Sequence, residues 1–163
     1  MKNKELFDLK NVLIEMIEEK EYRGIEFSYF VIKNKKLVEQ QCNLLEELIK
    51  DNAMEEFEKN RIDILTEFSK DDTGTSVTKP APNNRIEYVI NESRKEEFAS
   101  EMNKLKDKYS VQISEYSNKI NEYNVLLEKD FVEEVPFTKI SKEKLPNNIS
   151  LKHFNSIFDL IEM

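Results

Sequence analysis

The longest regular stretch of the sequence is residues 94–128, RKEEFASEMNKLKDKYSVQISEYSNKINEYNVLLE. Its large side chains recur at steps of three or four, the spacing that places residues on one face of an α-helix. They are Phe98, Met102, Leu105, Tyr109, Gln112, Tyr116, Ile120, Tyr123 and Leu127. The stretch contains neither glycine nor proline. It therefore predicts one continuous helix, and the apolar face of that helix predicts a second helix packed along it.

The second helix is predicted over residues 26–69. Steps of four and three, typical of a coiled-coil-like seam, connect Phe30, Asn34, Leu37, Gln41, Leu44 and Leu48. The phase shifts after Lys50-Asp51-Asn52 and the pattern restarts at Met54 and Phe57. Either a stutter within one helix or a short break explains the shift. We favour one long helix with a local irregularity.

Shorter elements complete the prediction. A helix is expected over residues 4–21, and Gly24 marks its end. Residues 70–84 hold the second glycine and two of the four prolines and are expected to form the main loop. Strands are expected over 85–90 and 131–137. They are natural partners because one precedes and the other follows helix 94–128, unless the length of that helix holds them apart. Ser150 is expected to cap a last helix over 151–162.

These elements predict a mainly α fold in a single elongated domain, residues 1–163. Two long antiparallel helices form a hairpin, joined by an additional N-terminal helix, a small two-stranded β element and a short C-terminal helix. The composition agrees, because two glycines in 163 residues leave little material for the tight turns of an all-β protein.

Composition also limits the function. The net charge of −8 disfavours binding to nucleic acid, whose phosphates repel an acidic surface. One cysteine, Cys42, and one histidine, His153, are too few for an internal disulfide or a Cys/His zinc site. No apolar run approaches the roughly 18 residues of a membrane span. The sequence thus predicts a cytosolic protein that is not an enzyme, with no catalytic residue, metal ligand or cofactor.

Five residues are candidates for binding a partner. Tyr109, Tyr116 and Tyr123 lie seven residues apart, so their rings fall on nearly one line of the helix and would form an adhesive aromatic ribbon. The alternative, which we favour, places these rings inside the helical hairpin. Asn34 and Gln41 are polar positions of the seam, where they would fix the register of a homo-oligomer or lie at the solvated edge of an intramolecular bundle.

Two parts of the sequence carry a resemblance. The first is the run Phe27 to Leu37, FSYFVIKNKKL, with its Glu-rich continuation to Arg61 and Leu65. The second is the tail, with an acidic segment at 132–137, an Ile-Ser-x-x-x-Leu segment at 140–145 and a last apolar helix at 149–161. From residue 22 onward the chain resembles small uncharacterised helical proteins encoded by phages and prophages of Gram-positive bacteria. The resemblance implies a phage origin and a helical-hairpin architecture, with no known activity; the Pro-rich insert at 80–82 departs from that pattern.

The sequence therefore predicts a non-catalytic phage-type protein that binds another protein in the host bacterial cytoplasm, as an inhibitor of a host protein such as a defence component. The alternative is a virion or assembly component that binds other phage proteins. A less favoured third hypothesis is an acidic DNA mimic built on glutamate clusters such as Glu55, Glu56 and Glu58, because lysines interrupt nearly every acidic run.

Overall fold

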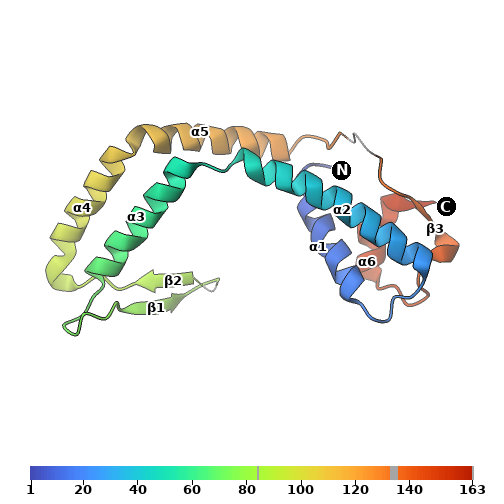
Figure 1. Ribbon diagram of the computed structural model, residues 1–163, viewed down its shortest axis with the longest axis horizontal. Coiled ribbons are helices and arrows are strands. Elements are labelled where there is room, and N and C mark those ends of the chain that lie inside the picture. Colours follow the sequence, from blue (N-terminus) through green and yellow to red (C-terminus); the bar gives the residue numbers. More distant parts are fainter. Residues whose placement is uncertain (84, 133–135, 163) are drawn as a thin grey trace. The chain divides into compact units, whose positions relative to one another are not determined.

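The computed structural model describes residues 1–83, 85–132 and 136–162. It is mainly helical, with small two-stranded sheets and a short C-terminal helix, which confirms the predicted fold class (Figure 1). Contacts divide the chain into two compact units. We call residues 1–50 with 121–163 the terminal unit and residues 51–120 the central unit. That both belong to one domain stays a prediction.

The terminal unit is built on two helices, α1 (Glu5–Glu18) and α2 (Ile25–Leu48), joined at Gly24. Gly24 has a φ of 125°, a backbone conformation that side chains disfavour, so a glycine fits this turn. The last turns of α5 (Ser110–Leu127) and the C-terminal segment complete the core. The core's fully enclosed side chains include Leu6, Leu13, Phe27, Phe30, Val38, Cys42 and Ile157.

The C-terminal segment contributes several short elements to this unit. They are β3 (Ile140–Ser141), η2 (Lys142–Lys144), α6 (Leu151–Ser156), η3 (Phe158–Leu160) and β4 (Ile161–Glu162). Strands β3 and β4 pair in parallel, Ile140 with Ile161, and both of these side chains are buried. The predicted helix 151–162 is therefore wrong beyond Ser156, because the chain leaves the helix to bury Ile161 beside Ile140. The cap is confirmed, since the Ser150 side chain accepts a hydrogen bond from the His153 N–H.

The central unit packs α3 (Asn52–Phe68) against α4 (Lys95–Lys108), which lie side by side in Figure 1. Phe68 meets Phe98 edge to face at 5.8 Å between ring centroids, and the Arg94 guanidinium lies 4.3 Å from the centre of the Phe68 ring. A hairpin of β1 (Thr78–Ala81) and β2 (Arg85–Tyr88) connects the two helices, followed by η1 (Glu92–Arg94). The aromatic contacts thus fix the end of α3 against the start of α4.

Both long helices are interrupted, contrary to the prediction. Helix 26–69 breaks at residues 49–51, because the extended Asp51 caps α3 by accepting hydrogen bonds from the N–H groups of Ala53 and Met54. Helix 94–128 breaks at Tyr109, whose φ of −105° and ψ of 16° lie outside the α-helical range. Its N–H still bonds to the Leu105 carbonyl, so the interruption is confined to one residue.

The predicted strand pairing is also wrong. Strand β2 falls within the predicted 85–90 segment, but its partner is β1, which lies inside the predicted loop 70–84. The turn between them contains Asn83 in the left-handed conformation, which asparagine tolerates. Of the predicted strand 131–137, residues 133–135 lie outside the described part, and the described residues are not in a strand. A partner four residues away along the chain needs a much smaller closed loop than one beyond a helix.

Candidate partner-binding site

A buried amide holds the segment before β3 against α2. Asn34 is 1% exposed, and its Nδ2 donates to the Thr138 carbonyl at 2.9 Å while its Oδ1 accepts from the Thr138 N–H at 2.8 Å. The Asn34 amide thus pairs with both backbone groups of Thr138, as a residue of a neighbouring strand would. Since both ends of the amide are used inside the chain, Asn34 positions this segment and presents no polar atom to a partner.

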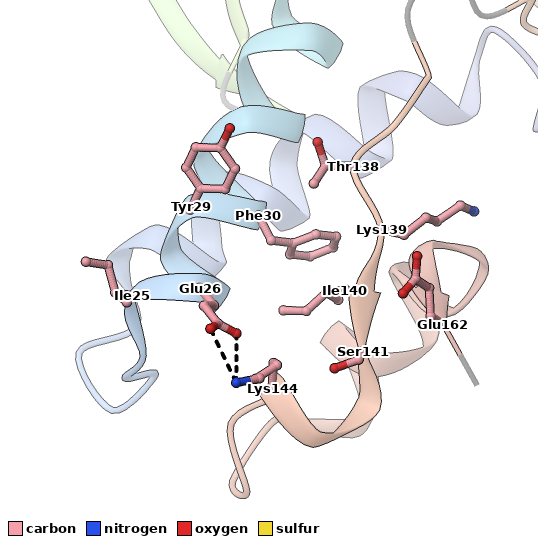
Figure 2. A pocket seen from close by; sticks show the side chains of 10 residues that line it. All are labelled: Ile25, Glu26, Tyr29, Phe30, Thr138, Lys139, Ile140, Ser141, Lys144 and Glu162. Carbon is pink, nitrogen blue, oxygen red and sulfur yellow. Dashed lines mark hydrogen bonds and ion pairs between the residues drawn. The ribbon is translucent and has the colours of Figure 1, made fainter.

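Between these two elements lies a groove of about 520 Å³, the α2 groove. Ten residues line it: Ile25, Glu26, Tyr29, Phe30, Thr138, Lys139, Ile140, Ser141, Lys144 and Glu162. Phe30 and Ile140 point toward one another from opposite walls (Figure 2). Both are buried, so they form the apolar floor of a surface hollow large enough for one or two side chains of another molecule.

One rim of the groove is unusually apolar for an outer helix face. Ile25, Tyr29 and Ile32 are four and three residues apart on α2, so they follow one stripe of the helix. They are 88%, 60% and 45% exposed. We call these three residues the α2 ridge. The core-facing side chains of α2, such as Phe27, Val31 and Val38, lie on the opposite side of the helix. The ridge is therefore surface apolar area with no role in the core of this unit.

Two lysines at the edge of the groove have partners within the chain. The Lys144 ammonium lies 3.1 Å from a carboxylate oxygen of Glu26, which joins the C-terminal segment to the first turn of α2 (Figure 2). The Lys139 ammonium donates to the Asp159 carbonyl. The Lys139 partner is a neutral carbonyl and the Glu162 carboxylate also lines the groove, so charged groups remain at the edge of its apolar floor.

A second polar cluster fixes the C-terminal segment to the rest of the terminal unit. His153 Nε2 lies 3.2 Å from a Glu15 carboxylate oxygen, and its Nδ1 lies 2.8 Å from the Tyr22 hydroxyl. Because a carboxylate only accepts, Nε2 is assigned as the donor to Glu15; in the tautomer with its proton on Nε2, the Tyr22 hydroxyl donates to Nδ1. That hydroxyl also accepts from the Ser150 N–H at 2.9 Å. The bonds of Lys152 and His153 lower the pKa of Glu15.

The other predicted binding residues lie in different settings. Tyr109, in the central unit, is 5% exposed; its hydroxyl donates to Glu56 at 2.7 Å and accepts from Asn60 at 3.3 Å. Tyr116 is half-buried. Tyr123 packs against the core of the terminal unit, and burial raises the pKa of its hydroxyl. Gln41 is half-buried on α2. The interior position favoured for the tyrosines therefore describes Tyr109 best.

The sequence analysis did not identify the α2 ridge, although the spacing of its residues was visible in the sequence. Ile25, Tyr29 and Ile32 have helical spacing, but so do the seam residues beginning at Phe30, and a sequence does not say which of two apolar stripes faces the core. The charged residues do not distinguish the two stripes either, because lysine and glutamate flank both of them. Only the packing of α1 and the C-terminal segment places Phe30 and Asn34 of this seam in the interior, and Leu44 and Leu48 at the end of the same seam are exposed.

No protein-family model, curated protein or solved structure matches this chain. Among the residues that the structure describes, no three His, Cys, Asp or Glu side chains are grouped as metal ligands would be. In the same described ranges, none of the helices combines the length and apolar character needed to cross a membrane.

Proposed function

We propose that this chain is a non-catalytic protein-binding protein and that it takes its partner on the α2 ridge and in the α2 groove. One observation carries the proposal: three large apolar side chains, Ile25, Tyr29 and Ile32, stand exposed on one stripe of α2 beside a hollow with an apolar floor. Protein interfaces concentrate their binding energy in such clusters, where an aromatic ring is surrounded by aliphatic side chains and fills or borders a pocket.

The chemistry of the site supports a protein surface as the occupant. The ridge offers a tyrosine, one of the residues most enriched at interface hot spots, and the groove offers the neutral hydroxyls of Thr138 and Ser141 next to the aromatic floor. A partner helix with one large apolar residue directed into the groove would bury both features. Such a contact forms without making or breaking a covalent bond.

The resemblance to phage-encoded proteins directs the search for this partner. On that basis the partner is a protein of a Gram-positive host cell, and binding inhibits it, as a phage protein directed against host defence would. Incorporation into virions is the second candidate role. It predicts a different location for the chain, in purified particles, where it should remain through washing at high salt.

The test compares two double variants of α2. In Tyr29→Ser/Ile32→Ser the ridge loses most of its apolar surface; in Leu44→Ser/Leu48→Ser two leucines of similar exposure, 55% and 52%, are removed from the other half of the same helix. Tagged chains are used to capture proteins from a lysate of the host. One stoichiometric protein should be captured by the wild type and the Leu44/Leu48 variant and should be lost, by at least about tenfold, with the ridge variant.

Two outcomes would contradict the proposal. If the ridge variant captures the same protein in equal amount, the partner binds elsewhere. If the Leu44/Leu48 variant loses the partner as completely as the ridge variant does, the effect is not specific to the ridge. Circular dichroism of both variants shows that each is folded before the comparison is made. Inhibition is tested separately, by asking whether the chain protects phage replication only in strains that carry the captured protein.

A further inference from the structure

The hairpin of the central unit has one strand edge whose backbone groups are available to pair with another strand. Its register matches Thr78 with Tyr88 and Pro80 with Ile86, and the Val89 N–H donates to the Val77 carbonyl at 2.9 Å. In an antiparallel ladder, hydrogen-bonded pairs alternate with pairs whose N–H and C=O groups point outward. The Val77 N–H donates to the Ser69 carbonyl at 2.9 Å, so a single ladder bond joins Val77 and Val89. Because the Val89 N–H is directed toward β1, the alternation along β2 directs the N–H and C=O groups of Ile86 and Tyr88 away from β1. In the part of the chain described, this sheet consists of two strands, so β2 has a free edge.

The two edges of the hairpin are chemically unequal. On the β1 edge the outward position opposite Ile86 is Pro80, which has no N–H to donate. The β2 edge carries both donor and acceptor at Ile86, and the side chain of Ile86 is 68% exposed. A free edge strand with an exposed β-branched residue is a template for another strand. Pairing is therefore favoured at β2 over β1.

The charges on β2 select a second copy of the same strand. If two β2 strands pair antiparallel about Ile86, Arg85 of each copy lies directly opposite Glu87 of the other. Within the chain, Glu87 already faces Lys79 at 3.3 Å, whereas Arg85 faces the uncharged Ala81. The paired sheet would thus present Lys79, Glu87 and the second copy's Arg85 as a row of alternating charge. A shift of the two-fold axis by one residue would instead bring Glu87 against Glu87, which is repulsive.

We propose that the chain self-associates through β2, with Arg85-Ile86-Glu87 of two copies forming an antiparallel pair at the centre of a four-stranded sheet. A hairpin of two four-residue strands has little stability of its own, and two added strands extend its ladder. The exposed Ile86 side chains lie opposite one another across the two-fold axis. This surface belongs to the central unit and is independent of the α2 ridge and groove.

Two proline variants test the backbone pairing by sedimentation equilibrium. Ile86→Pro removes the outward N–H of β2, and Thr78→Pro removes the outward N–H of β1 at an equivalent position of the same hairpin. Neither N–H is used between β1 and β2. The wild type and Thr78→Pro should show the same reversible monomer–dimer equilibrium at protein concentrations up to about 1 mM, the range of a weak interface, while Ile86→Pro should stay monomeric. A wild type that is monomeric at every concentration, or a dimer that survives Ile86→Pro, would overturn the proposal.

A charge exchange tests the partner and the register. Arg85→Glu makes the edge wholly acidic, and Lys79→Glu/Glu87→Arg makes it wholly basic while the ion pair within the hairpin is kept in reversed order. Each variant alone should dimerise at least about tenfold more weakly than the wild type, because like charges then oppose one another twice per dimer. An equimolar mixture should form a heterodimer. If the mixture behaves as the two separate variants do, the strands do not pair in this register and the proposal fails.

Discussion

The side-chain amide of Asn34 makes two hydrogen bonds to the backbone of Thr138, a residue 104 positions away along the chain. The pair joins α2 to the segment that leads into β3, and it holds Thr138, one of the residues that line the α2 groove, against the helix. A polar residue of a predicted helix seam is thus used to hold a strand-like segment, not a second helix.

Replacing Asn34 by leucine should lower the free energy of unfolding by about 2 kcal/mol, because the backbone N–H and C=O groups of the half-buried Thr138 would lose their partners. Asn43→Leu is the matched control, since Asn43 lies exposed on the same helix. Urea denaturation of both variants measures the difference. Equal stabilities of the two would show that water replaces the amide at no cost.

The Tyr22 hydroxyl bonds to both His153 and the Ser150 N–H, so Tyr22→Phe should destabilise the chain by about 1–2 kcal/mol. The control is Tyr29→Phe, a tyrosine 60% exposed on α2, which should change stability little. Thermal unfolding followed by circular dichroism provides the comparison. A larger loss in Tyr29→Phe than in Tyr22→Phe would contradict the assigned role of Tyr22.

Glu128 gives the chain a pH-dependent contribution to stability. The ammonium groups of Lys2 and Lys4 bond to its two carboxylate oxygens at 2.8 and 2.7 Å and lower its pKa from 4.5 to about 2. Because the pKa is lower in the folded state, the carboxylate stabilises the fold above about pH 4.5, and this contribution is lost as the pH falls toward 2.

Removal of both ammonium groups tests this assignment. In Lys2→Met/Lys4→Met the pKa of Glu128 should return toward 4.5, which carboxyl NMR titration measures directly. Lys10→Met removes a cation that lies beside Glu46, so it should leave the titration of Glu128 unchanged. The ion pair is exposed to solvent, and added salt should therefore reduce the shift in the wild type.

Tyr109 is predicted to stabilise the central unit through its hydroxyl. Tyr109→Phe keeps the edge-to-face contact with Phe57 but loses the bonds to Glu56 and Asn60, and unfolding should become about 1 kcal/mol easier. The half-buried Tyr116 provides the matched variant, Tyr116→Phe. Hydrogen exchange of the amides of α3 and α4 should accelerate in the first variant only; acceleration in both would remove the special role of Tyr109.

Local sequence patterns predicted where the helices lie. Helices α1, α3, α4 and α5 each fall inside a predicted helix, and α2 begins one residue before its predicted start at residue 26, because apolar spacing is a property of a few consecutive turns. The break at Asp51 also had a local signal, an Asp-Asn pair at a phase shift, but the capping bonds that decide between a stutter and a break depend on the backbone conformation of Asp51 itself. Local spacing therefore predicted the helices and left their continuity open.

The candidate site was less accessible to prediction. Asn34 was selected because it is polar within an apolar seam, and the structure places it in the interior, bonded to Thr138. The α2 ridge was missed because a helix with two apolar stripes does not indicate which stripe is covered. Both outcomes depend on the same event, the packing of the C-terminal segment against α2.

The sequence by itself determined the helical class, the positions of the main helices and the supply of a single cysteine and a single histidine, since composition and spacing are local properties. Tertiary structure alone decided that Asn34 holds Thr138 and that Ile25, Tyr29 and Ile32 face outward. The physical reason is that hydrogen-bond partners and burial are set by segments far apart in the chain, whose approach no local pattern specifies.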